Sequence, residues 1–340
     1  MKKSYTRITA LVLALILPLC GCKRPPEPET VMYINGRSIA REELISYAWR
    51  FIGQVDTENT FTADDFDKVL NEDGTTLADM VLDGALEYLL INCFFAEKAA
   101  ELVITLDASE TAGLDGDLTE LITTYGDKTA YEETLALSGM TASVNREVYL
   151  ADLLSNKVRG HLFGDGGPYA PDMTDLEDYY KWNYVTVSHV LRLCMDMTTG
   201  EAYPEEVQEK ALETARSVID RYNSGEDFIA LAEGLGEDDG LLQYPSRTYT
   251  FTYGDMAEEF ENASFALKEG EVTPEPVKTS YGYHVIKKYP LDDGYFESNL
   301  QAITSNYAQD ECEAVYNTWK SDVSIEYTAN YDEIDMKQYY

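Results

Sequence analysis

The sequence predicts an α+β fold in which a helical segment precedes a unit of strands and helices, after which the chain returns to helix. Three observations lead to this prediction. Apolar residues recur at helical spacing through most of residues 31–184, alternate with polar ones from Val185 to Met195, and regain helical spacing beyond Pro290. About 310 residues follow the first thirty, a length that favours two domains.

The first residues predict export from the cytoplasm. A basic start precedes an apolar run from Ile8 to Leu19, which is too short for a comfortable permanent bilayer-spanning helix. The stretch LCGC at residues 19–22 resembles a bacterial lipobox, in which an aliphatic residue stands three positions before the modified cysteine. The resemblance implies a signal peptide over residues 1–21 and a lipid on Cys22, which would anchor the protein to the extracytoplasmic face of the cell membrane. The alternative is a freely secreted protein with an ordinary cleavage site.

Residues 22–30 have the composition of a proline-rich tether, and the rest of the chain is strongly acidic. The sequence has 62 Asp plus Glu against 26 Lys plus Arg. Loss of residues 1–21 removes three basic residues and no acidic one, so the formal net charge changes from −36 to −39. Nucleic-acid binding needs a basic face to displace counterions, and this balance argues against it. An acidic surface would instead attract basic, unfolded polypeptides.

Cysteines and histidines are too few for a disulfide framework or a metal centre. With Cys22 lipidated and the signal peptide removed, Cys93, Cys194 and Cys312 remain, an odd number without a C-x-x-C pair. Three histidines in the whole chain argue against a histidine-based metal cage. We therefore expect no metal and no cofactor, and we assign no role to His161.

Residues 31–184 are expected to be mostly helical. A short strand over Val31–Ile34 leads into an Asn35-Gly36 turn. The expected helices begin near Ala40 and then cover residues 76–103, 118–125, 130–137 and 144–161. Thr174, with Glu177 three residues later, is the expected cap of one more helix.

Residues 185–290 follow the order strand, long helix, short helix, short helix, strand. The first strand places His189 on its apolar face. The long helix begins at Pro204 and is expected to end at Gly225. The last strand, in the stretch YGYHVIKK, contains His284. Each strand therefore holds one half-polar ring among apolar neighbours, which fits either packed core histidines or a site.

At these residues the sequence resembles the parvulin family of peptidyl-prolyl isomerases. The matching stretches are VSHVL, SGEDFIALAE and FTYGDMAEEFENASFALKEGEVTPEPVKTSYGYHVIKK, the last of which follows the family pattern over residues 251–288. The resemblance implies a four-stranded antiparallel sheet flanked by helices over residues 185–290, with the two histidines on adjacent strands. It also implies peptidyl-prolyl cis-trans isomerase activity, which needs no cofactor.

The layout of the whole chain is similar to that of the PrsA-type extracytoplasmic foldase lipoproteins and, more distantly, of SurA-type chaperones. This similarity implies that residues 31–184 and 291–340 pack together as a helical chaperone domain into which the parvulin domain is inserted. The implied partners are unfolded or newly secreted polypeptides that contain proline. The sequence leaves open whether the protein is a monomer or a homodimer.

Position by position, the resemblance implies two sets of site residues. The catalytic set is His189, Asp238 and His284. The substrate-binding set is Met256, Phe260, Phe251 and Thr279. Met256 and Phe260 are expected one turn apart on a helix, where such a pair is also common in ordinary cores. Asp238 stands in an acidic run, which also reads as solvated charge.

The chain departs from the family pattern around this implied site. Ser246–Tyr249 occupy positions where the family often has Gly-Asp-Leu-Gly, Gly236 takes the place of a serine, and Tyr281 that of a small hydroxyl residue. The loop Asp196–Pro204 contains no Lys or Arg, so selection of phosphorylated substrates is not expected.

Two functions remain open. The first is a foldase that isomerises X-Pro bonds and also chaperones unfolded chains. The second is a non-catalytic chaperone whose parvulin domain is only a peptide-binding scaffold. A solute-binding lipoprotein is a third interpretation, but it would need repeated βα units, which residues 31–180 do not show.

Overall fold

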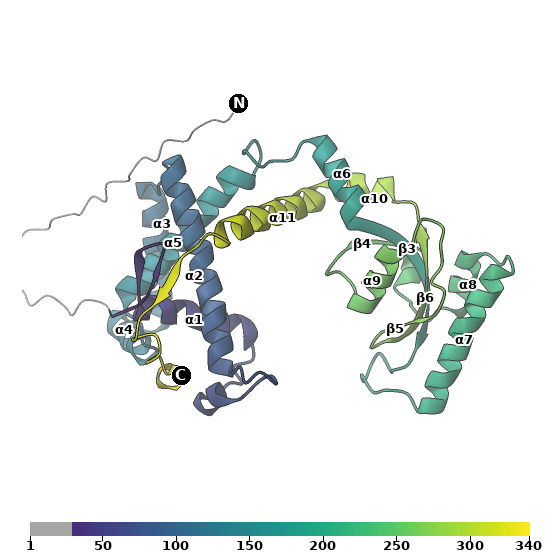
Figure 1. Cartoon of the computed structure of the whole chain (residues 1–340), viewed down its shortest axis with the longest axis horizontal. Coiled ribbons are helices and arrows are strands. Elements are labelled where there is room, and N and C mark those ends of the chain that lie inside the picture. Colours follow the sequence, from purple (N-terminus) through teal and green to yellow (C-terminus); the bar gives the residue numbers. More distant parts are fainter. Residues whose placement is uncertain (1–28) are drawn as a thin grey trace, which may run out of the picture. The chain divides into compact units, whose positions relative to one another are not determined.

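The computed structural model describes residues 29–340. The expected signal peptide, Cys22 and most of the tether lie outside the described residues. The chain divides into two compact units, each described here by itself (Figure 1). The first contains the described residues up to Leu154 together with Asp322–Tyr340, and the second is Ser155–Ser321. Within residues 29–340, no helix combines the length and the apolar character needed to cross a membrane.

The first unit joins both ends of the described chain through a small sheet. Strand β1 (Thr30–Ile34) pairs with β2 (Arg37–Ala40) on one side and with β7 (Ile325–Tyr327) on the other, in antiparallel fashion. The β1–β7 pairing brings the C-terminal tail back to the N-terminal segment. Strand β2 was not expected, because four residues between a turn and a helix carry too little pattern to mark a strand.

Helices make up the rest of the first unit. They are α1 (Arg41–Val55), α2 (Leu77–Leu102), α3 (Ala108–Thr124), α4 (Lys128–Leu137) and α5 (Ala142–Phe163), which continues into the second unit. Thr76 caps α2 and exchanges hydrogen bonds with Asp79, so the expected long helix is confirmed. Helix α3 begins ten residues before its expected start. Asp107 and Glu110 form a capping box there, ahead of an Ala- and Gly-containing turn with little apolar signal.

The second unit is built on the expected four-stranded antiparallel sheet. Its strands are β3 (Tyr184–Leu193), β4 (Tyr249–Thr252), β5 (Val277–Lys278) and β6 (Gly282–Tyr289), in the order β4-β3-β6-β5. The central pair, β3 and β6, carries the two histidines.

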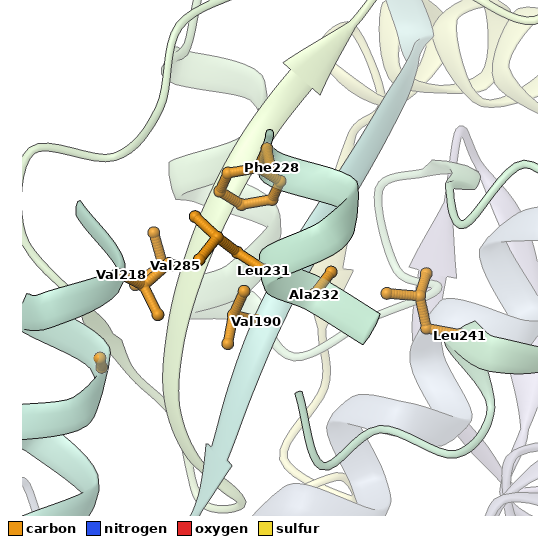
Figure 2. Close-up of a cluster of buried hydrophobic side chains, with 8 residues drawn as sticks. Val190, Val218, Phe228, Leu231, Ala232, Leu241 and Val285 are labelled. Atoms are coloured by element: carbon orange, nitrogen blue, oxygen red, sulfur yellow. The ribbon is translucent and has the colours of Figure 1, made fainter. Parts of the chain in front are cut away.

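Helices cover both faces of this sheet (Figure 1). Helices α7 (Glu205–Asn223) and α8 (Phe228–Leu235) lie on one face, where Val190 and Val285 pack against Phe228 and Leu231 (Figure 2). Helix α9 (Glu258–Ala266) covers the other face. Each fully buried side chain of this size contributes roughly 1.5–3 kcal/mol. Because helices cover both faces of the sheet, strand β3 is buried along most of its length. Its alternating side chains therefore point into two hydrophobic cores, one on each face, and not into one core and solvent.

The remaining helices of the second unit are α6 (Met173–Asn183), α10 (Asp293–Ser298) and α11 (Leu300–Lys320). Asp172 caps α6 and forms a capping box with Asp175. The expected Thr174–Glu177 cap is therefore wrong by two positions, because an earlier acidic pair has the same spacing. Tyr180 packs in an aromatic cluster with residues of α10 and α11. These three helices group with the sheet, whereas the sequence assigned them to the chaperone domain; of the C-terminal segment, only Asp322–Tyr340 joins the first unit.

Candidate active site

The two strand histidines meet on the α9 face of the sheet. Their Nδ1 atoms lie 3.1 Å apart, and the rings are nearly parallel, with planes 12° apart. Both side chains are buried, with exposed fractions of 4% for His189 and 5% for His284. Phe260 of α9 packs its ring edge-on against both imidazoles. The expectation that the histidines face each other from adjacent strands agrees with this geometry.

Asp238 reaches the pair from the loop after α8. Its Oδ2 lies 2.8 Å from Nε2 of His189, and its Oδ1 accepts from the backbone N–H of Gly240 at 2.9 Å. The preceding residue, Glu237, ties this loop to β3, because its N–H donates to the carbonyl of Leu191. Asp238 is thus built into the site and is not merely part of a solvated acidic run.

The hydrogen bonds of the site form one chain. Thr279 Oγ1 lies 2.9 Å from His284 Nε2 and accepts from the N–H of Tyr281 at 3.2 Å. With both rings neutral, a single arrangement satisfies every atom: the Thr279 hydroxyl donates to His284 Nε2, His284 Nδ1–H donates to His189 Nδ1, and His189 Nε2–H donates to Asp238. The site therefore holds a carboxylate and two imidazoles in a defined orientation.

The charges of the site follow from burial and these bonds. Burial alone would raise the pKa of Asp238, but hydrogen bonds from His189, Tyr249 and Leu241 outweigh it and lower the pKa to about 2. Burial, together with electrostatic repulsion from the adjacent His189 ring, lowers the pKa of His284 to about 3. At neutral pH the site therefore presents an ionised Asp238 beside a neutral His284.

A cavity of about 360 Å³ opens beside this chain of groups. Its volume lies within the range of about 300–1,000 Å³ that is usual for small-ligand sites. The lining residues are His189, Leu191, Met197, Asp238, Tyr249, Met256, Ala257, Phe260, Tyr281 and His284. No Lys or Arg occurs among them. The cavity thus joins an apolar wall to a polar, anionic floor.

The structure brings most of the predicted site residues to this cavity, but not all. Met256 lines the cavity together with Phe260. We had expected the two residues one turn apart on a helix, but Met256 lies in the turn ahead of α9. Phe251 is fully buried and contacts Phe260 from behind, so it supports the wall without lining it. Thr279 is also buried and does not line the cavity, but its hydroxyl contacts two lining residues, at Nε2 of His284 and at the N–H of Tyr281.

Several lining residues were not among the predicted site residues. Leu191 could have been found by strand alternation, because it lies two residues after His189 and opposite His284. Tyr249 and Tyr281 stand at positions where the sequence departs from the family pattern, and that departure was the available signal. Met197 and Ala257 carried no signal.

The described residues 29–340 contain no group of three or more His, Cys, Asp or Glu side chains arranged to hold a metal ion. Cys93, Cys194 and Cys312 are buried free thiols.

A sheet with two facing histidines, a carboxylate and an apolar pocket defines a parvulin-type peptidyl-prolyl isomerase domain. The family model for the rotamase, or PPIC-type PPIase, domain matches residues 189–289. The chain carries this domain, and as a whole it is similar to proteins named foldase protein PrsA.

Two curated relatives illustrate the similarity. The foldase protein PrsA of Caldanaerobacter subterraneus subsp. tengcongensis is 27% identical, over 86% of this chain and 88% of the relative. Foldase protein PrsA 3 of Bacillus anthracis is 37% identical over a shorter stretch, 32% of this chain and 39% of the relative. Among solved structures, a peptidylprolyl isomerase (PrsA) from Bacillus cereus matches with 22% identity, a TM-score of 0.34, and coverage of 81% of this chain and 97% of that one.

Proposed function

We propose that this protein is a lipid-anchored foldase on the extracytoplasmic face of the cell membrane, where it isomerises X-Pro bonds and chaperones unfolded secreted polypeptides. The observation that carries the proposal is the cavity at the Asp238–His189–His284 chain, where an apolar wall meets an oriented polar floor. The match to the PPIC-type domain and the similarity to PrsA foldases support it.

Isomerisation requires the amide to lose its resonance. The barrier is about 20 kcal/mol, and the uncatalysed reaction takes tens of seconds or longer. In the proposed complex the proline ring packs against Met256 and Phe260, which removes water from the amide. Catalysis then requires that the site bind the twisted amide more tightly than either planar form.

The charge of Asp238 supplies such a preference. A planar amide places partial negative charge on its carbonyl oxygen, whereas a twisted amide has lost much of that charge because nitrogen no longer donates into the carbonyl. A carboxylate held near the carbonyl therefore destabilises the planar forms more than the twisted one. The bonds from His189 and the backbone of Gly240 fix the carboxylate before substrate arrives, which avoids reorganisation during the reaction.

The acidic site selects against phosphorylated substrates. Asp238 contributes a negative charge to the cavity, and none of the lining residues is basic. A phosphate next to the proline would meet repulsion without a guanidinium to bind it. The proposed substrates are unmodified proline-containing segments.

A second cavity, within the first unit, supports the chaperone part of the proposal. It has a volume of about 620 Å³ and lies between α1, the loop after α2, α3 and α5. Its apolar lining includes Ile104, Leu106, Val144, Val148 and Leu154. Apolar segments of an unfolded chain could bind such a surface, and the strongly acidic chain would favour basic clients.

The experiment that tests the catalytic proposal measures isomerisation of a proline tetrapeptide by residues 23–340, beside Asp238→Ala and His284→Ala. Acceleration by the wild type that falls at least ~10-fold in both variants, with folding intact by circular dichroism, would support the enzyme and its site. Aggregation of an unfolded client, measured on the same samples, reports the chaperone activity separately.

The anchor is tested on the full-length chain in a bacterial host. We expect the wild type in the membrane fraction and Cys22→Ser in the soluble or secreted fraction, with Cys93→Ser as the matched control that stays in the membrane. Soluble wild-type protein would remove lipid anchoring from the proposal.

A second candidate function is a chaperone that binds prolyl peptides without isomerising them. Tyr249 and Tyr281 favour it, because these large rings line the cavity where the family pattern has small residues. The two candidates differ in one result: the second predicts no acceleration by the wild type while client aggregation is still suppressed.

A further inference from the structure

Tyr249 contributes a hydrogen bond to the site that the family resemblance does not assign. It lies on β4, opposite Val187 of β3, and its half-buried ring lines the cavity. Its hydroxyl donates to Oδ2 of Asp238 at 3.0 Å. The same oxygen accepts from Nε2 of His189 at 2.8 Å. One carboxylate oxygen thus receives both a phenol and an imidazole.

We infer that Tyr249 is a positioning residue, whose hydroxyl holds Asp238 in the orientation that receives the His189 Nε2–H and thereby fixes the tautomers of both histidines. The effect on the rate rests on the proposed isomerase function. The effect on the hydrogen bonds does not, since these exist in the free protein.

The two oxygens of Asp238 are held in different ways. Oδ1 accepts from the backbone N–H groups of Gly240 at 2.9 Å and Leu241 at 3.3 Å, which belong to its own loop. Oδ2 is held only by side chains from the sheet, Tyr249 from β4 and His189 from β3. Asp238 is about a quarter exposed, so without the phenol a water molecule can replace one partner of Oδ2.

The direction of the histidine chain depends on this acceptor. While Oδ2 accepts from Nε2, His189 must present a bare Nδ1, and His284 must donate to it from its own Nδ1. If Oδ2 turns away, His189 can carry its proton on Nδ1 instead. His284 would then have to accept at Nδ1 and donate from Nε2 to Thr279. A change at Tyr249 therefore reaches Thr279 through the side chains of Asp238, His189 and His284.

Gly240 gives independent evidence that this contact is tightly built. Its φ of −63° suits any residue, so the backbone does not require glycine here. A Cβ at this position would lie 2.9 Å from the hydroxyl oxygen of Tyr249 and 3.0 Å from Oδ1 of Asp238. Only a residue without a side chain leaves room for the two groups to meet. Both obstructing atoms are ends of movable side chains, so Gly240→Ala is expected to fold with the contact displaced.

The chain offers a simple spectroscopic test, because it contains only three histidines. Residues 23–340 labelled with 15N-histidine give three imidazoles, of which His161 is exposed and serves as the internal reference. Ring nitrogen shifts distinguish a protonated from a bare nitrogen. The samples are wild type, Tyr249→Phe, Gly240→Ala and, as the control, Tyr244→Phe, which alters an exposed ring packed against Tyr249.

We expect single tautomers in the wild type and in Tyr244→Phe, with the proton on Nε2 of His189 and on Nδ1 of His284. Tyr249→Phe and Gly240→Ala should both show averaged shifts for these two rings and none for His161. The kcat for the tetrapeptide should fall about 10-fold or more in both, the effect of losing one hydrogen bond to a charged group, with KM changed less.

Wild-type shifts in Tyr249→Phe would overturn the inference, whatever the activity. A loss of activity with unchanged tautomers would mean that Tyr249 only lines the cavity and does not position Asp238. If the wild type proves inactive, the proposed function fails while the tautomer measurement still decides the role of Tyr249.

Discussion

His189 and His284 touch through their Nδ1 atoms at 3.1 Å, although they are not opposite each other in the sheet. His189 faces Ile286, and His284 faces Leu191. Diagonal neighbours in an antiparallel pair lie about 7–8 Å apart at the backbone, which leaves room for two rings to extend toward each other. A register slip of one residue would place His284 on the opposite face, so the site depends on the β3–β6 register.

The buried His284 should make the stability of the sheet depend on pH. Its pKa is lowered from 6.5 to about 3, so the unfolded chain binds a proton where the folded one does not. The resulting stabilisation is fully present above about pH 6.5 and decreases as the pH falls toward 3. We expect the free energy of unfolding of the Ser155–Ser321 unit to drop by about 2 kcal/mol between pH 7 and pH 5.

Urea denaturation at the two pH values, followed through the amide resonances of β3 and β6, checks this. Asp238 does not interfere, because its lowered pKa removes stability only between about pH 3.8 and 2. His284→Gln should lose most of the difference, whereas His161→Gln, an exposed control, should keep it. Equal pH dependence in wild type and His284→Gln would contradict the prediction.

Thr279 should stabilise the site through its hydroxyl and not through its shape. Its Oγ1 bonds His284 Nε2 and accepts the N–H of Tyr281. Thr279→Val has nearly the same shape but leaves both groups without that partner. We expect a loss of about 1–3 kcal/mol of unfolding free energy, measured by urea denaturation, together with lower isomerase activity.

Thr279→Ser is the matched control, since it keeps the hydroxyl and removes only a methyl group. It should retain most of the stability and activity. If Val and Ser behave alike, the hydroxyl has no such role.

The sequence predicted the elements whose pattern is local and strong. The alternation around His189 and the stretch containing His284 placed both strands of the site, and the apolar spacing over residues 76–103 placed α2 to within one residue at each end. The four-stranded antiparallel sheet was inferred through the family resemblance and is confirmed.

Other features depend on contacts that a sequence pattern does not carry. Phe260 and Met256 both reach the cavity, but the chain between them leaves the helix, because the N–H of Met256 donates to the buried Glu261 side chain. Tyr249 and Asp238 lie in different elements, so no helical or strand periodicity relates them. The hydrogen bond between them forms because β4 pairs with β3. Hydrogen bonds of this kind determine which side chains line the site, whereas the periodicity of the sequence predicts only where the helices and strands lie.

Met256 should contribute to substrate binding more than to stability. Its side chain lines the cavity and is only partly buried. Met256→Ala removes an apolar contact that both the planar and the twisted substrate make, so KM should rise about 10-fold with little change in kcat. Steady-state kinetics with the proline tetrapeptide measures both.

Met197→Ala is the matched control for that experiment. Met197 also lines the cavity but is 57% exposed, so a rise in KM of only about 2-fold is expected. A fall in kcat at constant KM in Met256→Ala would assign its side chain to the transition state and refute the prediction.

Gly282 should be intolerant of any side chain, because β3 passes directly over it. It pairs with Leu193, and a Cβ would lie 2.0 Å from the carbonyl oxygen of Arg192. The obstacle is backbone, so relief requires β3 and β6 to separate two residues from His284. We expect Gly282→Ala to cost about 1–3 kcal/mol of unfolding free energy and to lower isomerase activity, because the register that aligns the histidines is strained.

Gly234→Ala in α8 is the matched control, since a Cβ there meets no atom within 4 Å. In that helix alanine should stabilise by about 0.5–1 kcal/mol. Urea denaturation of the two variants beside the wild type should therefore give shifts of opposite sign. A Gly282→Ala protein as stable and as active as the wild type would mean that the β3–β6 pairing can open at this end without disturbing the histidine pair, and the dependence of the site on the register would then be limited to the strand centre.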